Sequence, residues 1–385
     1  MSTPDSDSAA RLGSGSAVER GPRLGSDSAV ELGPRPLLEV HELSKTYRSK
    51  SLGARLRRAN EVKALREVSF DVKRGETLGL VGESGSGKST AASCVLRLTE
   101  PDSGTVTFDG VDVRALSKAE LRHLRARMQM VFQDPYGSLD PRLSVRELVE
   151  EPLLVHGLKD ETKRRERALQ MLERVGLSAS QAERNAHAFS GGQRQRIAIA
   201  RALVLNPELV VLDEPVTALD VSVQAQVLNL LTELQKELNL TYLFIVHDLA
   251  VAQYLCHRIA VMYLGEIVEI ASSQEIFDNP LHPYTVTLLM AAPVPDPDVM
   301  ASRRTALGTT APAGAKPGSG CPLQPRCPVG MNRPECASQR PVLREVAPGH
   351  QVACHFPGEL QASVAASLGA TTPESPSNPW TNTRG

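Results

Sequence analysis

Residues 82–89 read Gly82-Glu83-Ser84-Gly85-Ser86-Gly87-Lys88-Ser89, and this stretch decides the prediction of the fold. It matches the pattern G-x-x-x-x-G-K-[ST], with the apolar run 77–81 before it and a segment of helical periodicity, from Lys88 to Leu96, after it. Glycines let the backbone curl so that successive amides point at a triphosphate, and a helix N-terminus adds partial positive charge. We therefore expect a phosphate-binding turn rather than a chance Gly/Ser-rich loop.

The side chains of this turn have expected tasks. Lys88 can reach the β- and γ-phosphates of a nucleoside triphosphate such as ATP, and the Ser89 hydroxyl is placed to bind Mg²⁺. Thr90 follows directly and joins residues 82–89 in the predicted nucleotide-binding set.

A second motif, Leu209-Val210-Val211-Leu212-Asp213-Glu214, provides the acidic residues that such a turn needs. Its four apolar residues predict a strand that is covered on both faces. Asp213 is expected to organise Mg²⁺ and its waters, and Glu214 to polarise the attacking water as general base. The structural alternative is two acids at a solvated strand end, and the phosphate-binding turn upstream disfavours it.

Strand and helix signals alternate along the chain. Alternating or unbroken apolar runs predict strands over 37–43, 68–72, 77–81, 104–108, 209–212 and 242–246. Helical patterns cover 88–96, 115–127, 163–175 and 221–238. Such alternation implies right-handed crossovers, so the predicted fold class is α/β with a largely parallel sheet.

Composition excludes several classes of protein. The 385 residues are 41% hydrophobic and 23% charged, as in ordinary soluble globular proteins. The formal net charge is −1, which gives no reason to expect nucleic-acid binding. The apolar stretches fall far short of the ~18 residues needed to cross a bilayer, and the polar N-terminus lacks the core of a secretory signal. We expect a protein kept inside the cell.

Composition also predicts the organisation of the chain. Residues 1–36 contain a short polar repeat and are expected to form a disordered leader, because two copies cannot bury a core. The globular pattern runs from 37 to 290, and a Gly/Pro/Ala-rich linker follows at 291–320. A cysteine-rich segment is expected at 321–358 and a disordered polar tail at 359–385.

Four of the six cysteines, Cys321, Cys327, Cys336 and Cys354, cluster near the C-terminus. In a reducing compartment such a cluster suggests metal binding before disulfides. Four thiolates can hold a tetrahedral zinc ion or a [4Fe–4S] cluster. The spacing matches neither the usual paired zinc motifs nor the ferredoxin run, so metal-free packed thiols remain an alternative.

Three further motifs complete a family pattern. Phe189-Ser190-Gly191-Gly192-Gln193 lies between the two nucleotide motifs, Leu219-Asp220 follows Asp213-Glu214-Pro215, and His247 follows the next predicted strand. In this order, the motifs resemble the ATP-binding subunits of ABC transporters over residues 37–290. The resemblance implies a P-loop ABC ATPase domain with a mixed, largely parallel sheet and a helical subdomain at about 134–190.

The resemblance implies roles within one subunit for Tyr47, Gln133 and His247. Tyr47 corresponds to the aromatic residue that stacks on adenine, although a strand-edge tyrosine is otherwise a packing residue. Gln133 looks like the glutamine that contacts Mg²⁺ and the attacking water, in the loop that meets the membrane partner. His247 resembles the switch histidine that holds the γ-phosphate and Glu214.

Other motif residues are implied to act across a subunit boundary. Ser190, Gly191, Gly192 and Gln193 open a helix whose N-terminus would face the γ-phosphate bound by the opposite subunit. Asp220 would lie at the contact between subunits. Each chain would hold half of each site, so two ATP molecules would join two subunits and hydrolysis would separate them. Phe189 and Thr217 depart from the commonest family residues, Leu and Ser, and both changes are conservative.

Segments outside the ATPase core indicate a branch of the family. Phe132 to Arg142, Val261 to Glu269, Asn279 to Thr285 and Pro293 to Pro297 look like the F-type subunit of oligopeptide/dipeptide importers. The resemblance implies an ATPase peripheral to the cytoplasmic face of the cell membrane. Its partners would be two permease subunits, a D-type sister ATPase or a second copy, and indirectly an external binding protein.

Alternatives to this interpretation are nickel or another small solute as cargo, a soluble ABC ATPase of translation or DNA repair, and a non-enzymatic metal-binding adaptor. A single P-loop and the absence of a heptad run disfavour the soluble ATPase, and the intact motifs disfavour the adaptor. Some members of the importer branch hold a [4Fe–4S] cluster in the cysteine segment, which adds to the case for one here.

Overall fold

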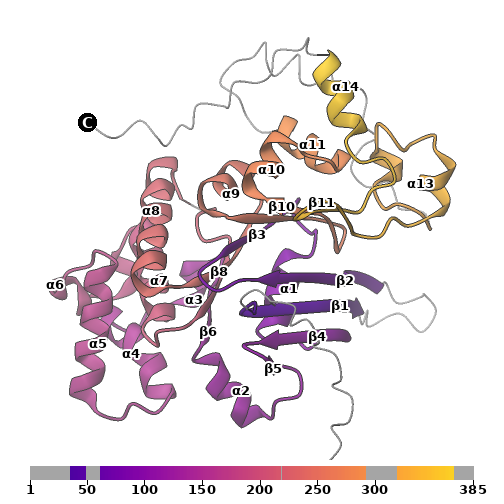
Figure 1. The fold of residues 1–385 in the computed structure, drawn as a ribbon. Helices are drawn as coiled ribbons and strands as arrows, with labels where there is room; N and C mark the ends of the chain where they lie inside the picture. The colour runs from indigo at the N-terminus through magenta and orange to yellow at the C-terminus, as the bar shows by residue number, and fades with distance from the viewer. Residues whose placement is uncertain (1–34, 49–60, 218, 292–318, 368–385) are drawn as a thin grey trace, which may run out of the picture. The chain divides into compact units, whose positions relative to one another are not determined.

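The computed structural model of the chain describes residues 35–48, 61–217, 219–291 and 319–367. Within these ranges, the larger sheet has the strand order β11-β12-β10-β9-β3-β8-β7-β6 and the smaller sheet has the order β2-β1-β4-β5 (Figure 1). The strands are β1 (Leu38–Arg48), β2 (Glu61–Val72), β3 (Thr77–Val81), β4 (Ser103–Phe108), β5 (Val111–Asp112), β6 (Met128–Val131), β7 (Leu209–Asp213), β8 (Thr241–Val246), β9 (Arg258–Tyr263), β10 (Glu266–Ser272), β11 (Arg344–Ala347) and β12 (His350–Val352).

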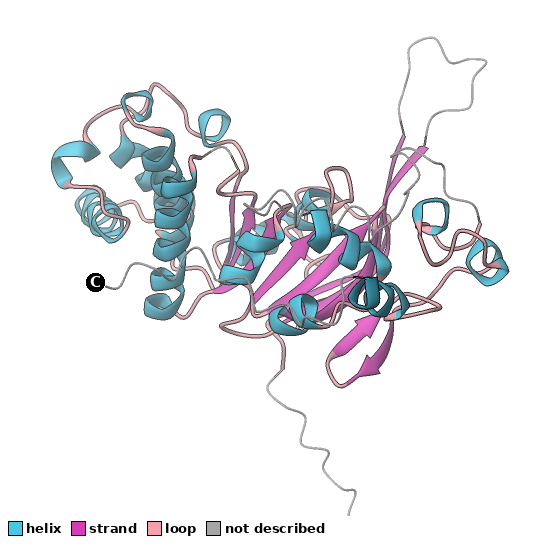
Figure 2. Ribbon diagram, turned by 90° about the horizontal axis from the view of Figure 1, so that it is seen from above, coloured by secondary structure: helices cyan, strands magenta, loops and turns pink. Residues whose placement is uncertain are grey.

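The largest group of helices lies to the left of the sheet in Figure 2, and other helices lie over the sheet and to its right. The helices are α1 (Lys88–Val95), α2 (Lys118–Arg125), α3 (Pro135–Ser138), α4 (Val145–Val155), α5 (Glu161–Arg174), α6 (Ala179–Ala182), α7 (Gly191–Leu203), α8 (Val221–Leu238), α9 (Leu249–Leu255), α10 (Ser273–Asp278), α11 (Pro283–Ala291), α13 (Pro334–Ser338) and α14 (Glu359–Ser367). Two short 3₁₀ turns are η1 (Ala186–Ala188) and η2 (Gln324–Arg326).

The centre of the larger sheet is parallel, as predicted. Strands β6, β7, β8, β3 and β9 pair in parallel, whereas β10, β12 and β11 extend the sheet in antiparallel fashion. The parallel strands therefore all end at one edge, and their loops lie on that side. This mixed α/β arrangement confirms the predicted fold class.

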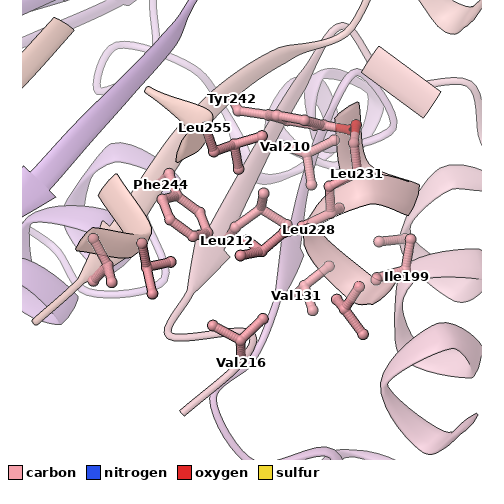
Figure 3. Packing of buried hydrophobic residues seen from close by; sticks show 14 of the residues in the cluster. Val131, Ile199, Val210, Leu212, Val216, Leu228, Leu231, Tyr242, Phe244 and Leu255 are labelled. Carbon is pink, nitrogen blue, oxygen red and sulfur yellow. The ribbon is translucent and has the colours of Figure 1, made fainter. Parts of the chain in front are cut away.

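Alternate side chains of the central strands enter two separate cores. On β7, Val210 and Leu212 face the helices α7 and α8, and Leu209 and Val211 face the smaller sheet and α1. Figure 3 shows the first core, in which the ring of Tyr242 packs beside Leu231 and donates its hydroxyl to the Leu231 carbonyl at 3.0 Å. Because both faces are covered, these strands are unbroken apolar runs in the sequence.

Most predicted elements match the structure, and the differences have local causes. The helix 221–238 has the predicted bounds. The helix predicted over 115–127 is shorter, because the Ser117 side chain and Glu120 form a capping box that starts α2 at Lys118. Strands β1 and β2 extend beyond the predicted bounds into residues that, apart from the buried Leu65, are exposed or half-buried, so they show little apolar alternation.

The prediction of a disordered tail from residue 359 is wrong for residues 359–367, which form α14. Leu360 and Val364 lie four residues apart and pack against Val286 of α11 in a small core. Arg333 also donates to the Glu359 carboxylate at 2.7 and 3.1 Å. The leader 1–34, the linker residues 292–318 and the tail 368–385 lie outside the described residues.

A buried carboxylate joins the C-terminal segment to the larger sheet. Glu269 on β10 is 0% exposed and accepts hydrogen bonds from the backbone N–H groups of Leu281 (2.7 Å) and His282 (3.0 Å). Its carboxylate also lies 2.7 Å from Nε2 of His350 on β12. Two other parts of the chain, residues 281–282 and His350, thus bind one buried carboxyl group of β10.

We expect Glu269→Ala to lower the free energy of unfolding by about 3–5 kcal/mol, because all three partners lose their acceptor inside the protein. Chemical denaturation followed by circular dichroism measures this change. Glu275→Ala is the control, because Glu275 is half exposed and lies 3.8 Å from the other ring nitrogen of His350. Equal stabilities of the two variants would contradict the prediction.

Candidate nucleotide site

Four strand ends bring the predicted catalytic residues together. In the parallel register Val81 lies opposite Val246, Asp213 opposite Ile245, and Val131 opposite Leu212. The segments that follow these strands carry the phosphate-binding turn (P-loop, residues 82–89), Glu214, His247 and Gln133. They meet at the carboxyl edge of the sheet, where ligands of open α/β sheets bind.

The P-loop has the backbone that its glycines permit. Gly87 has φ +107°, and a Cβ there would lie 2.4 Å from the Ala64 carbonyl of β2, so only glycine fits. The Lys88 Nζ donates to the carbonyls of Gly82 (2.7 Å) and Glu83 (3.0 Å). The hydroxyl of Ser86 is buried and has no hydrogen-bond partner among the described residues, which suits a group that would contact phosphate oxygens.

Burial and two nearby carboxylates act in opposite directions on the pKa of the Lys88 ammonium group. Lys88 is 4% exposed, and burial lowers the pKa of its ammonium group, whereas the carboxylates of Glu214 and Asp213 raise it. A buried cation next to open backbone amides is a preorganised partner for phosphate.

A side-chain pair links the P-loop to β7. The Ser89 hydroxyl donates to Asp213 Oδ1 at 2.9 Å, so two of the three predicted Mg²⁺ ligands lie side by side. Burial raises the pKa of Asp213, and the hydrogen bond from Ser89 lowers it. A hydroxyl and a carboxylate are oxygen donors of the kind that Mg²⁺ prefers, so these residues fit the ion, which would neutralise phosphate charge when bound.

Glu214 is the centre of a hydrogen-bonded group. Its Oε2 accepts from Gln133 Nε2 at 3.0 Å and from the Thr217 hydroxyl at 3.1 Å, and it lies 3.4 Å from His247 Nδ1. Its backbone has φ +45°, and its N–H donates to the Ile245 carbonyl. A carboxylate fixed by neighbouring donors at a strand end can orient a water molecule and accept its proton.

The segment 189–193 is positioned by α7 and the start of α8. The Ser190 hydroxyl accepts from the Gln193 N–H at 3.3 Å, and the Gln193 side chain accepts from the Ser190 N–H at 3.1 Å, which is a capping box. Gly191 lies close to Leu219, and Gly192 lies against Val223. This places the N-terminus of α7 near the start of α8, where the exposed Asp220 is the residue at the N-cap position.

The contact of Gly192 with Val223 gives a prediction. A Cβ on residue 192 would lie 2.3 Å from Val223 Cγ1, and valine side chains are stiff at χ1. We expect Gly192→Ala to lower the free energy of unfolding by about 1–3 kcal/mol through overpacking. Thermal or urea unfolding measures the change. The double variant with Val223→Ala should regain most of the loss relative to Val223→Ala alone, and a fully stable single variant would contradict the prediction.

Two further predicted binding residues are Tyr47, on β1, and Thr90, which directly follows the P-loop. Tyr47 is 44% exposed on β1, and it pairs in register with Val62 on β2, the strand whose Ala64 carbonyl contacts Gly87. Lys45 lies 5.8 Å from the centroid of the Tyr47 ring. Thr90 lies in the first turn of α1 and is partly buried. The exposed Tyr47 ring therefore lies on the smaller sheet, whose strand β2 touches the P-loop at Gly87.

Comparison with known proteins identifies the family. Residues 65–217 match the ABC transporter family, and residues 268–336 match the family described as Oligopeptide/dipeptide transporter, C-terminal region. The chain is 52% identical over 319 residues to a Brucella ovis protein named for ATP binding in peptide import, covering 83% of this chain and 97% of that protein. The chain belongs to the ABC transporter family of ATP-binding proteins.

Other relatives agree with this assignment. The ABC chain is 50% identical over 322 residues to the oligopeptide transport ATP-binding protein AppF of Bacillus subtilis, over 83% of this chain and 97% of AppF. The dimeric ATP-binding cassette MJ0796 in a post-hydrolysis state with ADP and Pi has TM-score 0.54 and 33% identity, over 61% of this chain and 98% of that one. CbiO1 of Clostridium perfringens has TM-score 0.55 and 31% identity, over 63% and 91%. The ABC chain is therefore an ATPase.

The four C-terminal cysteines of this ABC protein converge in space. All are buried, and they line one cavity of about 10 Å³ together with Gly330 and Phe356. The Gly330 N–H donates to Cys327 Sγ at 3.2 Å. Burial raises the pKa of Cys321 to about 11. In the part of the chain that is described, no group of three or more His, Cys, Asp or Glu side chains is arranged to hold one metal ion.

Sequence analysis missed two residues that touch the P-loop from the C-terminal region. The N–H of Glu83 donates to the Tyr284 hydroxyl at 2.9 Å, and Arg326 pairs with the Glu83 carboxylate at 3.3 Å. Tyr284 lies within the segment 279–285 that indicated the importer branch, but no spacing rule points from there to the P-loop.

Among the described residues, no helix of the ABC chain is long and apolar enough to span a membrane.

Proposed function

We propose that this ABC ATPase drives the import of oligopeptides or dipeptides. The observation that carries the proposal is the match of residues 268–336 to the Oligopeptide/dipeptide transporter, C-terminal region. Relatives that are about half identical, such as AppF, are named for oligopeptide transport, and they are matched over almost their whole length. The P-loop and Glu214 group supply the site for the energy-releasing step.

The geometry supports specific tasks for the site residues in ATP hydrolysis. Backbone amides of residues 82–89 and Lys88 would hold the phosphates, and Ser89, Asp213 and Gln133 would hold Mg²⁺. Glu214 would take a proton from the attacking water while Gln133 and His247 keep its carboxylate in place. Tyr47 would stack on the adenine ring.

A second subunit would complete the site. Residues 190–193 form the N-terminal turn of α7, which packs against the start of α8. The P-loop, Gln133, Glu214 and His247 instead follow the ends of strands. We propose that residues 190–193 and Asp220 face the ATP of a D-type sister ATPase, or of a second copy, and that ATP closes this dimer.

A groove near Gln133 supports contact with membrane permeases. Leu98 is 49% exposed and Phe132 is 47% exposed, and a hollow of about 220 Å³ lies between them. The hollow is lined mostly by apolar side chains, including those of β6, α4 and α7, and Phe132 directly precedes Gln133. We propose that a cytoplasmic segment of each of two permeases docks here and holds the ATPase peripherally at the cytoplasmic face of the membrane.

Purification of the tagged chain from its own membranes in mild detergent tests the partners. The proposal expects two polytopic permeases and a related ATPase, and proteoliposomes of this complex with its binding protein should accumulate labelled di- or oligopeptides only with internal ATP. Glu214→Gln complexes are the matched control for energy coupling. Uptake of nickel but not of peptides would show that nickel is the cargo. Ribosomal or DNA-repair partners without permeases would refute a role in transport.

We further propose that Cys321, Cys327, Cys336 and Cys354 hold a [4Fe–4S] cluster. Convergence of four thiols on one cavity and the N–H donors to Cys327 and Cys354 suit thiolate ligands. Anaerobically purified protein should contain about four iron atoms per chain and absorb visible light, and Cys327→Ser should lose both. Cys94→Ser, at a buried cysteine of α1, is the control. Zinc or no metal would refute the cluster.

A further inference from the structure

One side chain connects the cysteine segment directly to the P-loop. The guanidinium of Arg326 donates to both carboxylate oxygens of Glu83 at 3.3 Å, across 243 residues of sequence. Both nitrogens of one guanidinium face both oxygens of one carboxylate, and this paired geometry restricts orientation as well as distance. Arg326 is mostly covered, and Glu83 is about half exposed.

Three groups of Glu83, namely its carboxylate, its N–H and its carbonyl, each form a hydrogen bond with another residue. Its carboxylate pairs with Arg326, its N–H donates to the buried Tyr284 hydroxyl at 2.9 Å, and its carbonyl accepts from Lys88 Nζ at 3.0 Å. Two of these three partners come from the region after residue 280. Because Glu83 is the second residue of the P-loop, its placement affects the amides that face the phosphates.

Arg326 is itself positioned by the cysteine segment. It ends η2, directly before Cys327, and its N–H donates to the Leu323 carbonyl at 2.8 Å. The same segment is tied to α13 because the Cys321 N–H donates to the Cys336 carbonyl at 2.8 Å. The Arg326 guanidinium also lies 5.9 Å from the centroid of the Tyr263 ring, and that ring lies 4.6 Å from the Tyr284 ring. A change in the cysteine segment therefore moves the guanidinium that holds Glu83.

We propose that Arg326 is a positioning residue through which the cysteine segment and ATP binding regulate each other. An ordered cysteine segment holds Glu83 and so favours the nucleotide-binding form of the P-loop. By thermodynamic reciprocity, bound nucleotide must stabilise the cysteine segment by the same factor. This inference rests on the proposed ATP binding, and it is independent of the cargo and of whether the thiols bind a metal.

Nucleotide affinity is the first readout, measured by calorimetric titration of the full chain with a non-hydrolysable ATP analogue and Mg²⁺. Arg326→Gln should weaken affinity about three- to fivefold, as expected for a partly covered ion pair, while kcat at saturating ATP changes little. Glu83→Gln should have a similar effect, and the double variant should be no worse than either single one. Arg333→Gln is the matched control, because Arg333 lies in the same segment but pairs with Glu359.

Hydrogen exchange of backbone amides in residues 321–331 is the second readout. The nucleotide analogue should slow this exchange about three- to fivefold in the wild type and in Arg333→Gln, and Arg326→Gln should abolish the effect. Thermal unfolding shows whether each variant is folded. Unchanged affinity in folded Arg326→Gln, or nucleotide protection that persists in it, would overturn the proposal. Neither readout depends on peptide uptake, so a failure of the uptake experiment would not change the result of either one.

Discussion

Glu214→Gln should bind ATP and Mg²⁺ with nearly unchanged affinity and lose about 10²- to 10⁴-fold in hydrolysis rate. Glutamine keeps the size and the hydrogen-bonding reach of glutamate, so the group formed with Gln133, Thr217 and His247 can persist. It cannot accept a proton from water at neutral pH. Phosphate release under saturating ATP measures the loss, and size-exclusion chromatography of the assembled ATPase pair with ATP should show a persistent closed dimer.

Glu237→Gln provides the control for Glu214→Gln. Glu237 lies on α8 and makes an exposed ion pair with Arg174, away from the strand ends. This variant should hydrolyse ATP at the wild-type rate and separate after hydrolysis. Wild-type turnover in Glu214→Gln would remove Glu214 from the role of general base, and loss of ATP binding would show that the substitution disrupts the P-loop group instead.

Lys88→Ala should weaken nucleotide affinity about 10- to 100-fold, which corresponds to the loss of charge-assisted hydrogen bonds to phosphate. Lys88 is the buried cation between the P-loop carbonyls and the carboxylates of Asp213 and Glu214. Calorimetric titration with ATP and Mg²⁺ measures the change.

Lys88→Met separates charge from packing, because methionine retains an apolar stem in the buried position. It should show a similar loss of affinity with less change in thermal stability. Lys236→Ala, at an exposed position of α8, should bind ATP normally. ATP affinity that is unchanged in both Lys88 variants would refute the proposed contact of Lys88 with phosphate.

The fold could be predicted from local patterns because the central strands are covered on both faces. The runs at 209–212 and 242–246 are apolar throughout. Helix α8 lies between them in the sequence, and its helical pattern predicts its bounds. The hydrophobic pattern did not predict those parts of strands and helices that bury few or no apolar side chains. Outer parts of β1 and β2 are mostly exposed or half-buried, and α14 has two buried apolar residues, Leu360 and Val364, which pack in a small core with Val286.

The candidate site could be predicted for the residues that belong to contiguous motifs. Residues 82–90, 189–193 and 213–214 have spacings that reflect local requirements, such as a phosphate-binding turn or a helix cap. The contacts of Tyr284 and Arg326 with Glu83 could not be predicted, because they join positions 201 and 243 residues apart. Similarly, the capping pattern at Ser190 is visible in the sequence, but its contact with the start of α8 is not.

Local sequence patterns specify the chemical groups of this protein: a P-loop, its acidic partners and four cysteines within residues 321–354. Which of these groups come into contact depends on the tertiary structure. Parallel register brings Gln133, Asp213, Glu214 and His247 to one edge of the sheet. Packing of the C-terminal segment places Arg326 against Glu83. Such distant contacts depend on the burial and hydrogen bonding of the whole chain, which local sequence patterns do not encode.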